Sequence, residues 1–365
     1  MMYTDGTITY ADNIIVRRPE ADEYYTFLLT PQKADSSDTL ELFDKLFNKY
    51  CKDKYDSSEI NDKKRFISPD VEPNKNESYP NCFPKVSDHL KELLENKIWA
   101  NEIYIDDEKV YLSVMNGNLH ALNKGGTYSY LIEKGLIEKS GKRIGMFFPD
   151  IYCEVKKNYF TTSDDKVDFS DEKITISQAQ KKTIEYITEL VGEHEIKPCI
   201  SQTTIMDMKG RTIATLYITG MYKGVPFDAN EMKKIGAMGT NGYSNNKEYY
   251  NLPECAIMDS SDNFDIITGY SHNYKIRDEK KVNLKIGLKE ATRIVDKTFS
   301  VNLKLIIKRI ELVYCRQILT DEKDGEIIYD CYPVWKLSGK TNNSNNDLCI
   351  YVNALNGECY YYENQ

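Results

Sequence analysis

The residue types that most often carry catalysis are scattered along this chain of 365 residues. Its four histidines lie in four separate segments, at His89, His120, His194 and His272. None is four residues from another and none adjoins a cysteine, so neither a helical metal pair nor a nucleophile beside its base is indicated. The patterns Gly-x-Ser-x-Gly, His-Glu-x-x-His and the phosphate-binding P-loop do not occur in the sequence. We therefore expect structural or surface roles for the histidines, no catalytic residue and no cofactor.

The nine cysteines do not form a metal-binding pattern. The sequence has no Cys-x-x-Cys and no Cys/His cluster at zinc spacing, which argues against a structural zinc site. Because nine is an odd number, at least one cysteine is unpaired within the monomer. The last four either form disulfides in an exported protein or lie buried in strands: Cys315, Cys331, Cys349 and Cys359. We favour burial, because free cysteine is among the most buried residue types.

Two acidic loops have the composition, but not the spacing, of a calcium site. Asp259-x-x-Asp262-x-x-Asp265 and Asp321-x-x-Asp324-Gly325 lack the alternating ligands and the distal glutamate of an EF-hand. Hairpin turns use the same residue types, so we interpret both loops as turns and expect no metal. Among the 57 acidic residues, no pair is singled out as a glycosidase-like acid and base. A hydrolase whose carboxylates converge only in three dimensions stays an alternative.

Aromatic residues are the better candidates for binding. The chain has 28 tyrosines, and those of the late strands exceed what one inward sheet face absorbs in strict alternation. Tyrosine and tryptophan favour interfaces. The candidate binding residues are therefore Tyr222, Tyr332, Trp335, Tyr351 and Tyr360. The alternative is that each belongs to the core or to a cross-strand pair.

Composition and charge limit the classes of partner. Apolar residues make up 41% of the chain and charged residues 29%, which is typical of globular proteins. A net charge of −9 and the lack of a basic cluster interleaved with aromatics argue against nucleic acid. No run approaches the ~20 apolar residues that span a bilayer. The first residues lack a signal-like charged and apolar region, so we expect any targeting or anchoring segment to lie outside this sequence.

The first 165 residues predict an α+β domain with an insertion. Short strand-like runs over residues 3–30 precede an amphipathic helix near 37–50, and a polar, proline-containing stretch over 52–84 is typical of a mobile loop. A second helix follows Ser87. Beyond it, Asn116-Gly117 predicts a tight hairpin turn within an antiparallel meander.

Two later segments have the same order of elements, a helix followed by strands. In residues 166–282, Thr175-x-x-Gln178 matches a capping box, and two strands should turn at Lys209-Gly210. In residues 283–365, a helix from Lys285 precedes strands that end in a hairpin at Asn356-Gly357. That hairpin should set Ala354 opposite Cys359 and Val352 opposite Tyr361. The fold class predicted for the chain is α+β, with antiparallel sheets each covered by helices.

The last eighty residues resemble a known module. Ile286-x-Leu288-x-Glu290-Ala291, then Tyr332-Pro333-Val334-Trp335, and finally Tyr351-Val352-Asn353-Ala354-x-x-Gly357-Glu358 are similar to the PepSY-type module, especially the PepSY-like domains of YycH/YycI-type and related exported proteins of Gram-positive bacteria. That family commonly has aspartate where this chain has Asn353. Residues 173–272 match more loosely, which suggests tandem PepSY-like units in the C-terminal part.

The resemblance implies a function without catalysis. Such proteins are extracytoplasmic, are usually held at the membrane by an N-terminal lipid or helix, and bind or restrain another protein. We therefore expect a regulatory or binding protein, or lipoprotein, of the cell envelope, located at the outer face of the cytoplasmic membrane, whose partner is an envelope or membrane protein. The alternatives are the hydrolase above and a peptide- or carbohydrate-binding module that uses the tyrosines.

Overall fold

The structure, a computed structural model, describes most of the chain. The described residues are 8–31, 41–49 except 43 and 47, 64–67, 100–105, 110–115, 118–123, 130, 133–134, 153–234, 243–245, 255–270, 274–298, 305–319, 328–341 and 347–363. The expected turn at Asn116-Gly117, the helix after Ser87 and most of the 52–84 insertion lie outside these residues.

The protein is mainly β, so the α+β class expected from the sequence is wrong. Strands account for most of the described chain, and the helices with stated bounds are only α6 (Ile176–Val191) and α7 (Leu288–Thr298). The helix predicted from Lys285 is confirmed as α7, and the described residues within 41–49 are helical as well; the class is wrong because strands make up much more of the described chain than these helices do. Among the described residues, no helix has the length and apolar character needed to cross a membrane.

The chain divides into two compact units, each assembled from separate segments. Unit 1 combines Met1–Pro31, Thr219–Tyr250 and Tyr274–Gln365, and unit 2 combines Gln32–Ile218 with Asn251–Asn273. The three consecutive domains expected from the sequence, 1–165, 166–282 and 283–365, stay a prediction.

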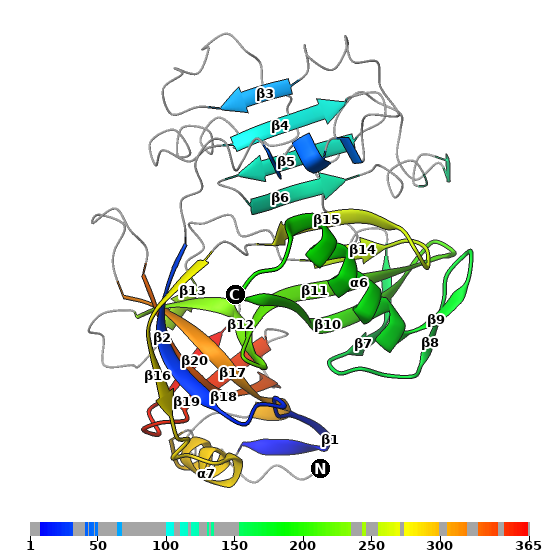
Figure 1. The fold of residues 1–365 in the computed structure, drawn as a ribbon. Coiled ribbons are helices and arrows are strands. Elements are labelled where there is room, and N and C mark those ends of the chain that lie inside the picture. Colours follow the sequence, from blue (N-terminus) through cyan, green and yellow to red (C-terminus); the bar gives the residue numbers. More distant parts are fainter. Residues whose placement is uncertain are drawn as a thin grey trace. The chain divides into compact units, whose positions relative to one another are not determined.

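Unit 2 contains an antiparallel sheet (Figure 1). One series of paired strands runs from β3 through β4, β5, β6, β15 and β14 to β11, and β7 pairs with β10. A small ribbon is formed by β8 and β9. The strands are β3 (Lys64–Ile67), β4 (Ala100–Ile105), β5 (Val110–Met115), β6 (Asn118–Asn123), β7 (Glu154–Tyr159), β8 (Lys166–Asp168), β9 (Lys173–Thr175), β10 (Lys197–Met208), β11 (Arg211–Tyr222), β14 (Cys255–Met258) and β15 (Phe264–Tyr270).

The sequence signals of α6 are confirmed. Thr175 accepts a hydrogen bond from the Gln178 amide at 3.1 Å, and the Gln178 side chain accepts one from the Thr175 amide at 2.7 Å, which completes the capping box. The buried face of α6 carries the expected stripe of Ile176, Ala179, Thr183, Ile187 and Leu190. The β10–β11 turn is also confirmed, since Lys209 and Gly210 both have positive φ.

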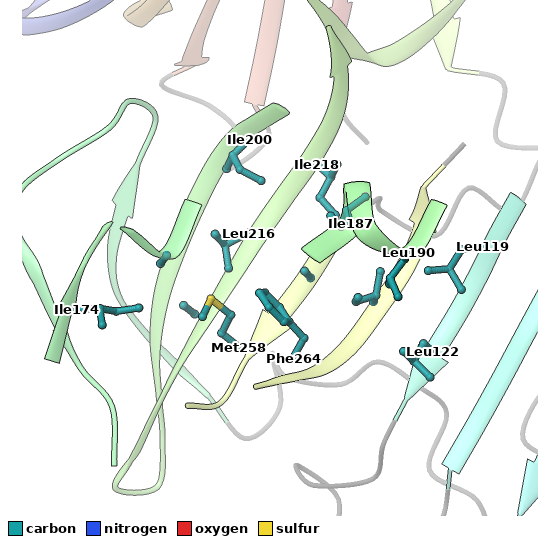
Figure 2. Packing of buried hydrophobic residues seen from close by; sticks show 14 of the residues in the cluster. Leu119, Leu122, Ile174, Ile187, Leu190, Ile200, Leu216, Ile218, Met258 and Phe264 are labelled. Atoms are coloured by element: carbon teal, nitrogen blue, oxygen red, sulfur yellow. The ribbon is translucent and has the colours of Figure 1, made fainter. Parts of the chain in front are cut away.

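The core of unit 2 lies between α6 and one face of the sheet. Ile187 and Leu190 of the helix share a cluster with Leu216, Met258 and Phe264 of the strands. Figure 2 shows this cluster, which also includes Leu119 and Leu122 of β6. Tyr186 stacks on Phe264 with ring centroids 4.4 Å apart. Each such apolar side chain contributes about 1.5–3 kcal/mol when fully buried.

Unit 1 contains a mixed sheet built around β17. This strand pairs in parallel with β1 near its start and with β12 near its end, and pairs antiparallel with β18 on its other side. On the far side of β18 lie β19 and then β20. The first residues of β18 pair with β2, and β2 pairs in turn with β16. At the other edge, β13 pairs with β12. The strands are β1 (Thr9–Arg17), β2 (Tyr24–Pro31), β12 (Val225–Lys234), β13 (Tyr243–Asn245), β16 (Tyr274–Val282), β17 (Leu305–Ile318), β18 (Tyr329–Thr341), β19 (Asp347–Asn353) and β20 (Cys359–Glu363).

One face of this sheet packs against α7. Ala291 and Val295 of the helix share a core with Leu312 of β17, Leu337 of β18 and Ile350 of β19. A close approach of backbones supports the same strands: a Cβ on Gly339 would lie 2.2 Å from a backbone oxygen of β17. Glycine is therefore required there.

The final hairpin exists, but the register expected for it is wrong. Val352 lies opposite Cys359, and Ile350 lies opposite Tyr361, a shift of two residues from the prediction. The turn is wider because Ala354 is engaged elsewhere: its amide donates to the Pro333 carbonyl at 3.0 Å, and its own carbonyl accepts from Lys285 and Ile286. These long-range hydrogen bonds decide the register in place of the Asn356-Gly357 pair.

Candidate functional site

The five aromatic residues predicted to bind a partner lie in the interior of unit 1. All are at most 7% exposed: Tyr222, Tyr332, Trp335, Tyr351 and Tyr360. The structure therefore places them in the core and in cross-strand contacts, which was the alternative interpretation, and not on an exposed surface. The prediction assumed that only one face of the sheet is buried. Both faces are covered where these residues lie, so the sheet buries more aromatic side chains than expected.

Trp335 and Tyr222 are separate from the other three. Trp335 belongs to the α7 side of the sheet, where its indole N–H donates to the Ile286 carbonyl at 2.8 Å. Tyr222 packs edge-on against Phe27 at 4.9 Å between ring centroids, and its hydroxyl donates to Glu279 at 2.9 Å. Both aromatic rings thus bury their apolar part and satisfy their polar atom.

Tyr332, Tyr351 and Tyr360 come together on the opposite face of the sheet. The rings of Tyr351 and Tyr360 are stacked with centroids 5.3 Å apart. The hydroxyls of Tyr332 and Tyr360 lie 3.3 Å apart, and Tyr332 donates to Gln317 at 2.8 Å. Tyr360 donates to the sulfur of Cys315 at 3.6 Å. This side of the sheet therefore has an interior lined by phenols as well as by aliphatic groups.

A buried ion pair lies in the same interior. Lys336 of β18 contacts Asp228 of β12, and only 7% and 3% of these residues are exposed. The second carboxylate oxygen of Asp228 accepts a hydrogen bond from the Tyr351 hydroxyl at 2.6 Å. The backbone carbonyl of Asp228 accepts one from Arg316 at 3.2 Å. We call Asp228, Lys336 and Tyr351 the Asp228 centre.

A bulge in β12 directs Asp228 toward these partners. Phe227 lies opposite Tyr314 and Glu231 lies opposite Arg316, so residues 228–230 occupy the space opposite a single residue of β17. Bulges commonly redirect a side chain and are frequent near functional sites.

The Asp228 centre also shows that the sheet curls. β12 and β19 are three strand spacings apart along the sheet, or about 14 Å on a flat sheet. A 2.6 Å hydrogen bond between their side chains therefore requires strong curvature. In agreement, β13, the partner of β12, comes close to β20 at the other end of the series. The strands enclose the tyrosines and the ion pair.

The ionisable groups of this interior are held in unreactive forms. Burial alone would lower the pKa of Lys336, but the Asp228 carboxylate outweighs it and raises that pKa above its ordinary value, so the amine stays charged. Burial raises the pKa of the Cys315 thiol to about 12 and raises the pKa of Tyr360 well above its ordinary value. A charged amine, a neutral thiol and a neutral phenol are poor nucleophiles at neutral pH.

In unit 2, the acidic loop at Asp259 is a turn, as interpreted from the sequence. Asp259 forms an ion pair with Arg211 and accepts a hydrogen bond from Asn263 at 3.0 Å. Burial and the nearby Asp265 raise the pKa of Asp259. Within the part of the chain that the structure describes, no group of His, Cys, Asp and Glu side chains has a metal-binding arrangement. The second acidic loop, at residues 321–325, lies outside the described residues.

Three of the four late cysteines are buried in strands, as favoured from the sequence. Cys315, Cys331 and Cys349 are at most 7% exposed, and Cys359 is half-buried. Cys315, Cys349 and Cys359 are free thiols. The Cys349 sulfur lies 3.6 Å from the Ser338 hydroxyl.

Sequence reasoning missed Asp228 and Lys336. The available signal was a single charged residue within each of two apolar runs, Val225-Pro226-Phe227-Asp228 and Val334-Trp335-Lys336-Leu337. Each charge taken alone is consistent with an outward-facing strand position. Only the contact between strands that are distant in sequence identifies them as a pair.

The fold has a counterpart among solved structures, whereas the sequence matches no protein-family profile and no curated protein. An uncharacterized protein from Eubacterium rectale ATCC 33656 is similar, with a TM-score of 0.53 and 13% identity over 96% of this chain and 91% of that chain. At this identity the likeness shows the fold alone. The Bacillus megaterium YpeB C-terminal domain is also similar, with a TM-score of 0.34 and 10% identity over 92% of this chain and 99% of that domain. A TM-score below 0.5 does not establish a common fold.

Proposed function

We propose that this protein is a non-catalytic regulatory or binding protein of the bacterial cell envelope that acts through contacts with another protein. The observation that carries the absence of catalysis is the interior of unit 1. Its polar groups are buried, engaged with one another, and held in charged or protonated forms that do not attack a substrate.

The envelope setting rests on the PepSY-like resemblance of the C-terminal residues. The segments that carry it, from Ile286 to Glu358, fold together: α7 shares one core with β17, β18 and β19. On this proposal the chain works outside the cytoplasmic membrane, is held at its outer face, and is related to the YycH/YycI-type proteins.

The hydrolase alternative has one observation in its favour, the raised pKa of Asp259 next to Asp265. Both side chains are nearly inaccessible, at 3% and 1% exposed, and Asp259 is already bound by Arg211 and Asn263. A general acid must reach its substrate. We therefore prefer the binding function.

Two measurements test the proposal. Cell fractionation of the source organism, with protease added to intact spheroplasts, should degrade the protein while cytoplasmic markers survive. Photo-crosslinking residues placed at the exposed apolar positions Val16, Leu319 and Tyr361 should give a position-dependent adduct with one envelope protein. The same probe at exposed Asn356 is the matched control. Protection from protease, or adducts that do not depend on position, would refute the proposal.

A further inference from the structure

We propose that the Asp228 centre is a lock that holds β12, and with it β13, across the tyrosine-lined interior of unit 1. The inference does not depend on the proposed function. It concerns which interaction keeps one edge of the sheet in place.

The backbone pairing of β12 is interrupted at the bulge. Before its bulge, β12 is paired with β17 at Phe227, and pairing resumes only at Glu231. The hairpin with β11 adds two residue pairs, Met221 with Pro226 and Tyr222 with Val225. By contrast, β17 and β18 are paired along almost their whole length.

Side-chain contacts hold β12 at the point where its backbone pairing is interrupted. From the bulge, the Asp228 carboxylate contacts Lys336 on β18 and Tyr351 on β19, which belong to the continuous part of the sheet. A buried ion pair is costly to desolvate, and its best-attested use is to specify one arrangement over others. The observed register of β12 places the Asp228 carboxylate between these two partners.

The lock has a consequence for the aromatic residues. Tyr332, Tyr351 and Tyr360 are buried inside the curl that β12 and β13 complete. Release of β12 would remove the carboxylate beside Tyr351 and open this side of the interior. The tyrosines would then become accessible without unfolding of β17, β18 and β19.

Amide hydrogen exchange measured residue by residue tests the lock. In the Asp228→Asn variant, the β12 amides from Glu231 to Lys233 should exchange at least tenfold faster. Their exchange should also depend less on low urea concentrations than exchange of the β18 and β19 amides, because release of β12 exposes less surface than unfolding of unit 1. Tyr351→Phe, which leaves both charges in place, should give a smaller increase in the same amides. Asp296→Asn is the matched control, because Asp296 is a partly buried carboxylate in the same unit that accepts from Tyr10 at 3.1 Å.

The exchange rates of β12 either support or refute the lock. Unchanged β12 exchange in Asp228→Asn would overturn the proposal. It would also be overturned if β12 exchange had the same urea dependence as exchange of the β18 and β19 amides, since β12 would then open only when unit 1 unfolds. If Asp228→Asn does not fold, the same two comparisons are made with Tyr351→Phe, which removes one hydrogen bond only.

Discussion

Replacing Lys336 by methionine should destabilise unit 1 by about 3–5 kcal/mol. Methionine keeps much of the apolar stem but removes the charge, so Asp228, which is 3% exposed, is left as a buried carboxylate without its counter-ion. Breaking a buried pair from one side typically has this cost. The hydrogen bond from Tyr351 to Asp228 remains, so we expect the loss of stability to lie near the lower end of this range.

The double variant Asp228→Leu/Lys336→Met separates charge from packing. It leaves no buried charge, and replacing a whole ion pair by apolar residues is often neutral or stabilising. We therefore expect the double variant to recover most of the stability that Lys336→Met loses. This comparison distinguishes an unpaired charge from a badly filled cavity.

Tryptophan fluorescence during urea unfolding is the assay. The chain has two tryptophans, and Trp335 is buried in the core of unit 1. In a Trp99→Phe background the signal reports on unit 1 alone, which avoids treating a chain of two units as one transition. The reasoning is refuted if Lys336→Met lies within 1 kcal/mol of the parent protein, or if the double variant is no more stable than the single one.

Three further predictions concern backbone packing, acid stability and thiol reactivity. Gly339→Ala should lower the stability of unit 1 by about 3 kcal/mol or more because backbone atoms of β17 cannot yield, whereas Gly287→Ala, with open space around it, should leave the melting temperature unchanged. Burial opposes the shift, but hydrogen bonds from Ser261 lower the pKa of Asp171. The stabilisation that the Asp171 carboxylate contributes is therefore present above the ordinary aspartate pKa and is lost as pH falls. The stability difference between Asp171→Asn and the parent protein should vanish in acid, and a difference independent of pH would contradict this. Cys315 should resist a thiol reagent at pH 8 in the folded protein and react once denatured; labelling in the native state as fast as in urea would contradict its burial.

Local features of the fold could be predicted from the sequence. The capping box at Thr175, the stripe of α6 and the Lys209-Gly210 turn depend on residues within a few positions of one another. Such signals act in the same way in any fold, so they do not depend on knowledge of the tertiary structure.

Long-range features could not be predicted. The final hairpin has a different register because Ala354 bonds to Pro333, Lys285 and Ile286. The pairing of Asp228 with Lys336 joins residues 108 positions apart. Nothing in the immediate neighbourhood of these residues specifies such partners, and the excess of strand over helix likewise comes from pairing between distant segments.

The parallel pairing of β1 with β17 constrains the order in which the protein can be made. Thr9 bonds to Leu305, which is 296 residues later in the chain. At roughly 5–20 residues per second, β1 must wait about 15–60 s for its partner to be synthesised. During that time unit 2, whose two segments both precede β17, can form its core. Unit 1 is therefore completed last, after translation has passed β17, and its first strands carry unpaired edges until then.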